Sequence, residues 1–163
     1  MLARRLLLMA AAAMVGGCGF ELRRAPELKF QTVQLKGFAP HSPLAAELKR
    51  SIAQSRTTQV VEAAAQAQVV LEALNDGREK SVVASTATGE VRELQLRARF
   101  NFRLRSVTGK ELIPATEILL SRDMSYNEKD ALAKEQEEAL LYRAMQTDIV
   151  SQLMRRLAAV QTL

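Results

Sequence analysis

Cys18 is the only cysteine of this 163-residue chain, and its position suits lipid attachment. It follows the small residues of Val15-Gly16-Gly17, which end an apolar run that begins at Leu6 and is preceded by two arginines. This is the layout of a cleaved secretory signal, because a spanning helix needs about 20 residues. A thiol at the cleavage point accepts a diacylglycerol. We therefore expect residues 1–17 to be a lipoprotein signal peptide, and Cys18 to carry S-diacylglycerol and N-acyl lipid.

The residues around Cys18 also predict where the mature protein resides. Several acyl chains on one residue anchor a protein stably to a membrane. An aspartate directly after the cysteine would resemble an inner-membrane retention signal. Gly19 occupies that position instead, which favours transfer to the outer membrane. We expect residues 18–27 to be a lipidated tether at the periplasmic face of the cell outer membrane, and residues 28–163 to be a single domain. The alternative is an ordinary secretion signal with a buried cysteine nearby.

A row of arginines is the second group of residues that could have a chemical role. They alternate along the strand predicted over residues 93–105. Residues two apart in a strand point to the same face, about 7 Å apart. The row has one sign of charge except for Glu93 at one end. Guanidinium groups bind phosphate through two parallel hydrogen bonds, so the row suits a phosphorylated lipid; the alternative is a solubilising outer face. The row comprises Arg97, Arg99, Arg103 and Arg105, with Arg92 just outside it.

Residues for catalysis are scarce. His41 is the only histidine, and it precedes a proline-rich helix start. The chain has no nucleophile elbow, phosphate-binding loop or zinc-protease motif, and too few nitrogen and sulfur ligands for a zinc site. We expect no enzymatic activity, no metal and no cofactor. The formal charge of +5 falls to +3 without the two arginines of the leader. With no tryptophan and two tyrosines to stack on bases, nucleic acid is not an expected partner.

The strongest structural pattern lies in residues 93–105, which alternate between apolar and polar side chains. A period of two predicts a strand with one buried face. Thr108-Gly109-Lys110 predicts a hairpin turn into a second strand over residues 111–124, where Pro114 indicates an edge strand or a bulge. The expected buried residues of the first strand are Leu94, Leu96, Ala98, Phe100, Phe102 and Leu104.

Shorter strands are predicted earlier in the chain. Residues 30–35 and 57–62 form two apolar or β-branched runs. Residues 69–74 form another, which we expect to end at the turn signal Asn75-Asp76-Gly77. Residues 81–88 are expected to be extended.

Two helices complete the prediction. Ser42-Pro43 is a helix start that predicts a helix over residues 43–54. Ser125 and Glu128 have capping-box spacing and predict a longer helix over residues 128–160. Its apolar stripe runs through Leu141, Met145, Ile149, Leu153 and Leu157, broadened by Leu140, Val150, Met154 and Val160. These elements predict an α+β fold in two layers, with both helices on one face of the sheet.

Two motifs of this chain resemble the LptE family of lipopolysaccharide-assembly lipoproteins. They are Cys18-Gly-Phe-Glu-Leu-Arg23 and the run from Ala131 to Glu138, Ala-Leu-Ala-Lys-Glu-Gln-Glu-Glu, at the start of the long helix. The resemblance extends over essentially the whole mature chain. It implies two helices against a mostly antiparallel or mixed four-stranded sheet.

The resemblance also implies partners and a binding site. The partner would be the outer-membrane barrel LptD, which this chain would plug and help to assemble, and the ligand would be lipopolysaccharide in transit to the outer leaflet. Lys134 matches a family lysine associated with lipopolysaccharide contact. The family's basic residue between the middle strands has no direct counterpart, because residues 84–89 are uncharged, and Arg92 or the pair Arg78 and Lys80 could supply that charge. The alternative function is a stand-alone periplasmic lipoprotein that binds anionic lipid or glycan.

Overall fold

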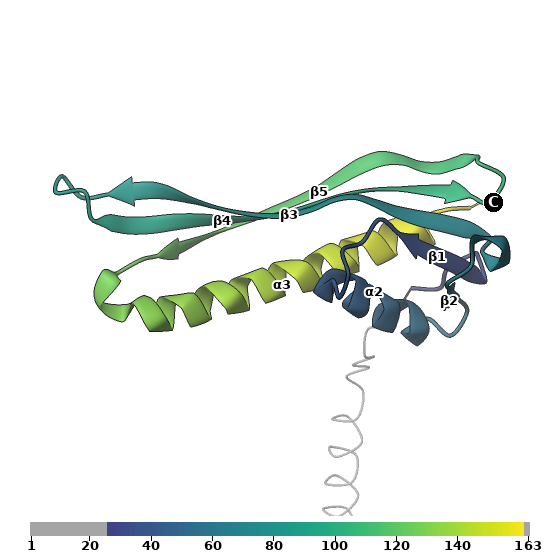
Figure 1. Ribbon diagram of the computed structural model, residues 1–163, viewed down its shortest axis with the longest axis horizontal. Coiled ribbons are helices and arrows are strands. Elements are labelled where there is room, and N and C mark those ends of the chain that lie inside the picture. The colour runs from purple at the N-terminus through teal and green to yellow at the C-terminus, as the bar shows by residue number, and fades with distance from the viewer. Residues whose placement is uncertain (1–25, 162–163) are drawn as a thin grey trace, which may run out of the picture.

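The computed structural model describes residues 26–161 as one sheet covered by two helices (Figure 1). The strands are β1 (Thr32–Lys36), β2 (Gln59–Val61), β3 (Val69–Ser85), β4 (Val91–Ser106) and β5 (Glu111–Ser125). The helices are α2 (Pro43–Gln54) and α3 (Ala131–Ala158), with short 3₁₀ turns η2 (Ala64–Gln66) and η3 (Glu128–Asp130). The predicted α+β class is confirmed.

The sheet is mixed and has five strands in the order β2-β1-β3-β4-β5, so the expected number of four is wrong. β1 runs parallel to both β2 and β3, whereas β3, β4 and β5 are antiparallel neighbours. The strand predicted over residues 57–62 is β2, a three-residue edge that lies beside β1 after α2 reverses the chain direction. β5 forms the opposite edge.

Both helices lie on the same face of the sheet, as predicted (Figure 1). α3 runs under the long strands, and α2 lies beside its second half. The alternating apolar residues of β4 form the part of the core that the sheet contributes, because all six residues expected to be buried in that strand are buried. Phe100 and Phe102 are fully buried and stack with centroids 5.7 Å apart. Tyr142 joins the predicted stripe of α3, whereas Leu140 is 61% exposed and does not belong to it.

The predicted turn at Asn75-Asp76-Gly77 is wrong. β3 continues through these residues, which pair with Asn101, Phe100 and Arg99 of β4. A register shift between Ala73 and Asn75 marks a bulge instead. The long partner strand β4 supplies hydrogen bonds over the whole length of β3, and this outweighs the local preference for a turn.

Of the other predicted features at the ends of helices and strands, the Ser42 cap forms and the Ser125 capping box does not. The Ser42 side chain accepts a hydrogen bond from the Ala45 amide at the start of α2, as predicted. Ser125, in contrast, ends β5, and the side chain of Asn127 accepts from the Lys129 amide, so the predicted capping box does not form. Pro114 lies on the edge strand β5 beside a register shift, which confirms that this proline marks an edge strand or a bulge.

Candidate functional site

Two of the predicted basic residues lie at the end of the sheet where β5 leads into α3. We call this region, residues 86–92 of the β3–β4 turn and 125–134 of the β5–α3 connection, the distal end (Figure 1). Lys134 Nζ donates to Ser125 Oγ over 3.0 Å, and the Arg92 carbonyl accepts from the Tyr126 amide over 2.8 Å. Arg92 and Lys134 are therefore anchored to consecutive residues of one strand end.

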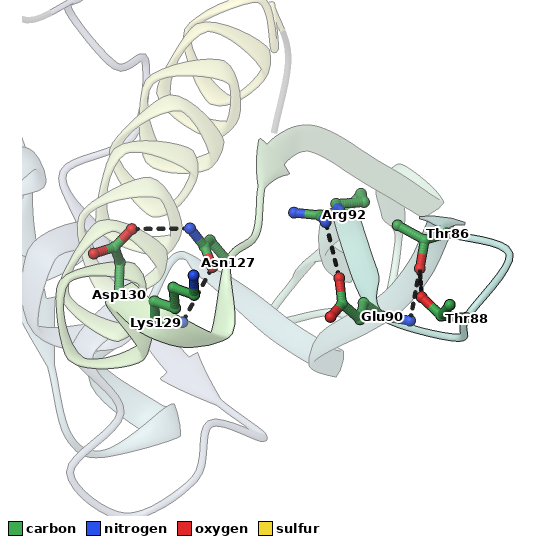
Figure 2. Close-up of polar contacts among 7 residues, drawn as sticks. All are labelled: Thr86, Thr88, Glu90, Arg92, Asn127, Lys129 and Asp130. Atoms are coloured by element: carbon green, nitrogen blue, oxygen red, sulfur yellow. Dashed lines mark hydrogen bonds and ion pairs between the residues drawn. The ribbon is translucent and has the colours of Figure 1, made fainter.

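A hollow of about 310 Å³ separates the two segments of the distal end. Figure 2 shows Glu90 and Arg92 on the hairpin side, and Asn127, Lys129 and Asp130 across from them. Arg92 Nη2 lies 2.8 Å from Glu90 Oε2, and Lys134 Nζ lies 2.8 Å from Glu137 Oε2. Lys129 also lines the hollow, and sequence reasoning missed it because it lies in the η3 turn. Three cations thus gather at this end, two of them paired with a neighbouring carboxylate.

Arg97, Arg99 and Arg103 lie elsewhere, on the face of the sheet that the helices leave uncovered. Arg99 Nη1 lies 2.9 Å from Glu117 Oε2 of β5, and its Nε lies 3.7 Å from Glu79 Oε1 of β3. Arg97 Nε donates to Gln95 Oε1 over 2.8 Å. The arginine row therefore runs between carboxylates of both neighbouring strands, which sequence alternation within β4 could not reveal.

Arg103 forms the shortest ion pair of that face. Its Nη2 and Nε both lie 2.6 Å from Glu72 Oε2 on β3, and the two residues are directly opposite in the register. Both side chains are about three-quarters buried, at 27% and 23% exposed. The hydrogen bond from Arg103 lowers the pKa of Glu72 below its ordinary value of 4.5, against the opposing effect of burial.

We expect a Glu72→Gln variant to lose about 1 kcal/mol of unfolding free energy at pH 7. Because the folded-state pKa lies below the unfolded-state value, the carboxylate stabilises the fold fully above about pH 5, and this contribution disappears as the pH falls through the folded-state pKa. Urea denaturation across this pH range measures the difference. Glu62→Gln is the control, since Glu62 is 97% exposed and lies 3.9 Å from Lys49. An equal difference at pH 7 and at low pH would refute the prediction.

The remaining candidates for chemistry are His41 and possible groups of metal-ligating side chains. His41 is exposed and adopts a positive φ of 58° just before the cap of α2. No group of three or more potential metal-ligating side chains occurs among residues 26–161. Within the same residues, neither helix combines the length and hydropathy that a membrane crossing requires. Cys18 and the leader lie outside the described residues.

Comparisons with known proteins identify the family. The model of the LptE family, described as lipopolysaccharide-assembly, matches residues 30–157. The LPS-assembly lipoproteins LptE of Yersinia pestis and Yersinia pseudotuberculosis are 27% identical to this chain over 157 residues, which cover 95% of this chain and 75% of theirs.

Solved structures agree in fold. An uncharacterized lipoprotein B from Nitrosomonas europaea superimposes with a TM-score of 0.73 at 33% identity, covering 86% of this chain and 91% of that one. The rare lipoprotein B of Shewanella oneidensis has a TM-score of 0.66 at 23% identity, covering 79% and 95%. The chain therefore belongs to the LptE family of lipopolysaccharide-assembly lipoproteins, which are not enzymes and need no cofactor.

Proposed function

We propose that this chain is held by lipid on Cys18 at the periplasmic face of the outer membrane, plugs the barrel LptD and assists its assembly, and binds lipopolysaccharide at its distal end. Residues 1–17 are the signal peptide of this proposal, residues 18–27 the tether and residues 28–163 the periplasmic domain. The observation that carries the binding site is that Arg92 and Lys129 line one hollow, and that Lys134 donates to Ser125 at the strand end beside it.

The chemistry of the distal end suits a phosphorylated sugar. Charge-assisted hydrogen bonds from arginine and lysine to phosphate are about twice as strong as neutral ones. These cations can replace the divalent ions that otherwise bridge lipid phosphates. Glu90 and Glu137 hold Arg92 and Lys134 in place until a phosphate, with more negative charge than one carboxylate, displaces them.

The uncovered face of the sheet suits contact with a barrel wall. Arg99 and Arg103 are already paired with carboxylates of the same face, so these two charges stay compensated when the face is enclosed. Leu74 and Leu119 lie beside these pairs and are 45% and 46% exposed. A sheet whose uncovered face carries internal ion pairs and a few exposed apolar side chains is a suitable plug for a lumen.

We expect an Arg92→Gln/Lys134→Gln variant to bind lipopolysaccharide roughly tenfold or more weakly than the parent, because two charge-assisted contacts are lost. An Arg97→Gln/Arg99→Gln/Arg103→Gln variant should lose less. These three arginines are proposed as secondary contacts, since a phosphate would have to displace Glu72 and Glu117 to reach two of them. Surface plasmon resonance with immobilised lipopolysaccharide measures both.

The triple variant also distinguishes the two explanations of the arginine row, which are lipid binding and a solubilising outer face. A purely solubilising face would leave the affinity of the triple variant unchanged, and circular dichroism checks that its fold persists. Unchanged affinity of the Arg92/Lys134 variant would refute the distal site. Binding by the purified chain in the absence of any barrel, without association with LptD in the cell, would instead favour a stand-alone lipid-binding lipoprotein.

A further inference from the structure

A second hollow lies far from the distal end, between α2 and α3 where β3 passes beside them. Its volume is about 540 Å³. α2 contributes residues at positions i, i+4 and i+7, and α3 contributes residues at the same kind of spacing, so each helix presents one continuous face to the hollow. The lining residues are Pro43, Glu47, Arg50, Arg78, Ala139, Arg143, Gln146 and Thr147.

The carboxylate in this hollow already has its partners. Glu47 Oε2 accepts from Gln146 Nε2 over 2.6 Å, and Glu47 Oε1 accepts from Thr147 Oγ1 over 2.7 Å. These bonds join α2 to α3 and direct both oxygens toward α3. Glu47 therefore stabilises the walls of the hollow and forms no ion pair with Arg50 or Arg143.

Arg78 enters the hollow from β3 and is held by neutral groups. Its Nη2 donates to Gln146 Oε1 over 3.3 Å, and its guanidinium lies 5.1 Å from the centre of the Tyr142 ring. Asp76 lies close enough for the charge of Arg78 to oppose the rise that burial causes in the pKa of Asp76. Gln146 thus orients Arg78 with one end of its amide and Glu47 with the other.

Arg50 and Arg143 have no ion-pair partner within residues 26–161, although two helices bring them to the same hollow. Even with Asp76 included, three arginines face two carboxylates. Guanidinium groups held near one hollow repel each other, and a bound anion would remove this repulsion. Guanidinium forks match the oxygens of phosphate.

We propose that the hollow between α2 and α3 is a second anion site, which binds a phosphate group between Arg50 and Arg143 with Arg78 as the third donor. The site is distinct from the distal end and does not depend on the proposed function. The phosphate could be part of a lipid headgroup or a free phosphate compound, because both present the same oxygens to the arginines.

Isothermal titration calorimetry tests this site with inorganic pyrophosphate at low ionic strength. The protein is the full chain in non-ionic detergent, carrying Arg92→Gln and Lys134→Gln so that binding at the distal end is weakened. We expect an additional Arg50→Gln/Arg143→Gln substitution to weaken pyrophosphate binding at least tenfold. Arg155→Gln is the matched control, because Arg155 is exposed on α3 and donates to Ser151 Oγ outside the hollow. It should retain the parent affinity.

A lysine variant tests whether guanidinium geometry is needed, and a lipid ligand tests where the phosphate comes from. Arg50→Lys/Arg143→Lys keeps the charge but loses the planar forks, and it should bind with intermediate affinity; it also replaces the glutamine variant if circular dichroism shows that variant to be unfolded. Dihexanoylphosphatidylglycerol, compared with its phosphatidylcholine analogue, tests the lipid source. Arginine-dependent binding of this lipid assigns the site to headgroups, and binding of pyrophosphate alone assigns it to free phosphates. No pyrophosphate binding, or equal affinity of the parent and both double variants, would overturn the site.

Discussion

A Cys18→Ser protein is expected to leave the outer-membrane fraction almost completely. A serine hydroxyl cannot accept the thioether-linked diacylglycerol, so the variant would lose its acyl chains. Each buried methylene contributes about 0.8 kcal/mol to membrane binding, and two or more chains make the attachment stable.

Fractionation of the membranes followed by immunoblotting measures this effect, and mass spectrometry of the mature N-terminus identifies the modification. Gly19→Ala is a suitable control, since it changes the residue next to the cysteine and leaves the thiol in place. Recovery of Cys18→Ser in the outer membrane with a free N-terminus, or of the parent with an unmodified thiol, would refute the lipid anchor.

A Gly37→Ala variant is expected to lose roughly 3 kcal/mol of unfolding free energy, a large part of the stability of a small domain. Gly37 follows β1 with φ at +79°, a conformation that costs residues with a Cβ about 1–2 kcal/mol. A Cβ there would also lie 2.3 Å from the backbone oxygen of Ala73 on β3. Because backbone atoms cannot rotate away, β1 and β3 would have to separate.

Gly109→Ala isolates the conformational part of this cost. Gly109 has φ at +91°, and no atom lies within 4 Å of the place that its Cβ would take. Urea denaturation followed by far-UV circular dichroism should therefore show a loss of about 1 kcal/mol for Gly109→Ala and a much larger one for Gly37→Ala. Equal losses in the two variants would contradict the close approach of β1 to β3.

The parts of the fold that sequence could predict are those in which one local pattern decides the structure. The alternation of β4 identified its buried face, and Ser42-Pro43 identified the start of α2. Asn75-Asp76-Gly77 misled because pairing with β4 is a non-local interaction that a local turn signal does not contain. The same limit explains the Ser125 capping box, since β5 extends through that serine to pair with Glu93.

The candidate site was predictable in kind but not in arrangement. Sequence identified Arg92 and Lys134 as basic residues, but only the fold brings them to consecutive residues of one strand end. The pairing of Arg99 and Arg103 with carboxylates of other strands depends on register, which periodicity within one strand does not determine. The hollow between α2 and α3 depends on how the two helices pack, and no sequence pattern predicted it.

The most direct test of the proposed role is to purify the tagged chain from outer membranes in mild detergent and to identify its partners by mass spectrometry. We expect LptD to copurify in a stable complex, and depletion of the chain to reduce lipopolysaccharide at the cell surface. Recovery of the chain alone, together with normal surface lipopolysaccharide after its depletion, would contradict the proposed role.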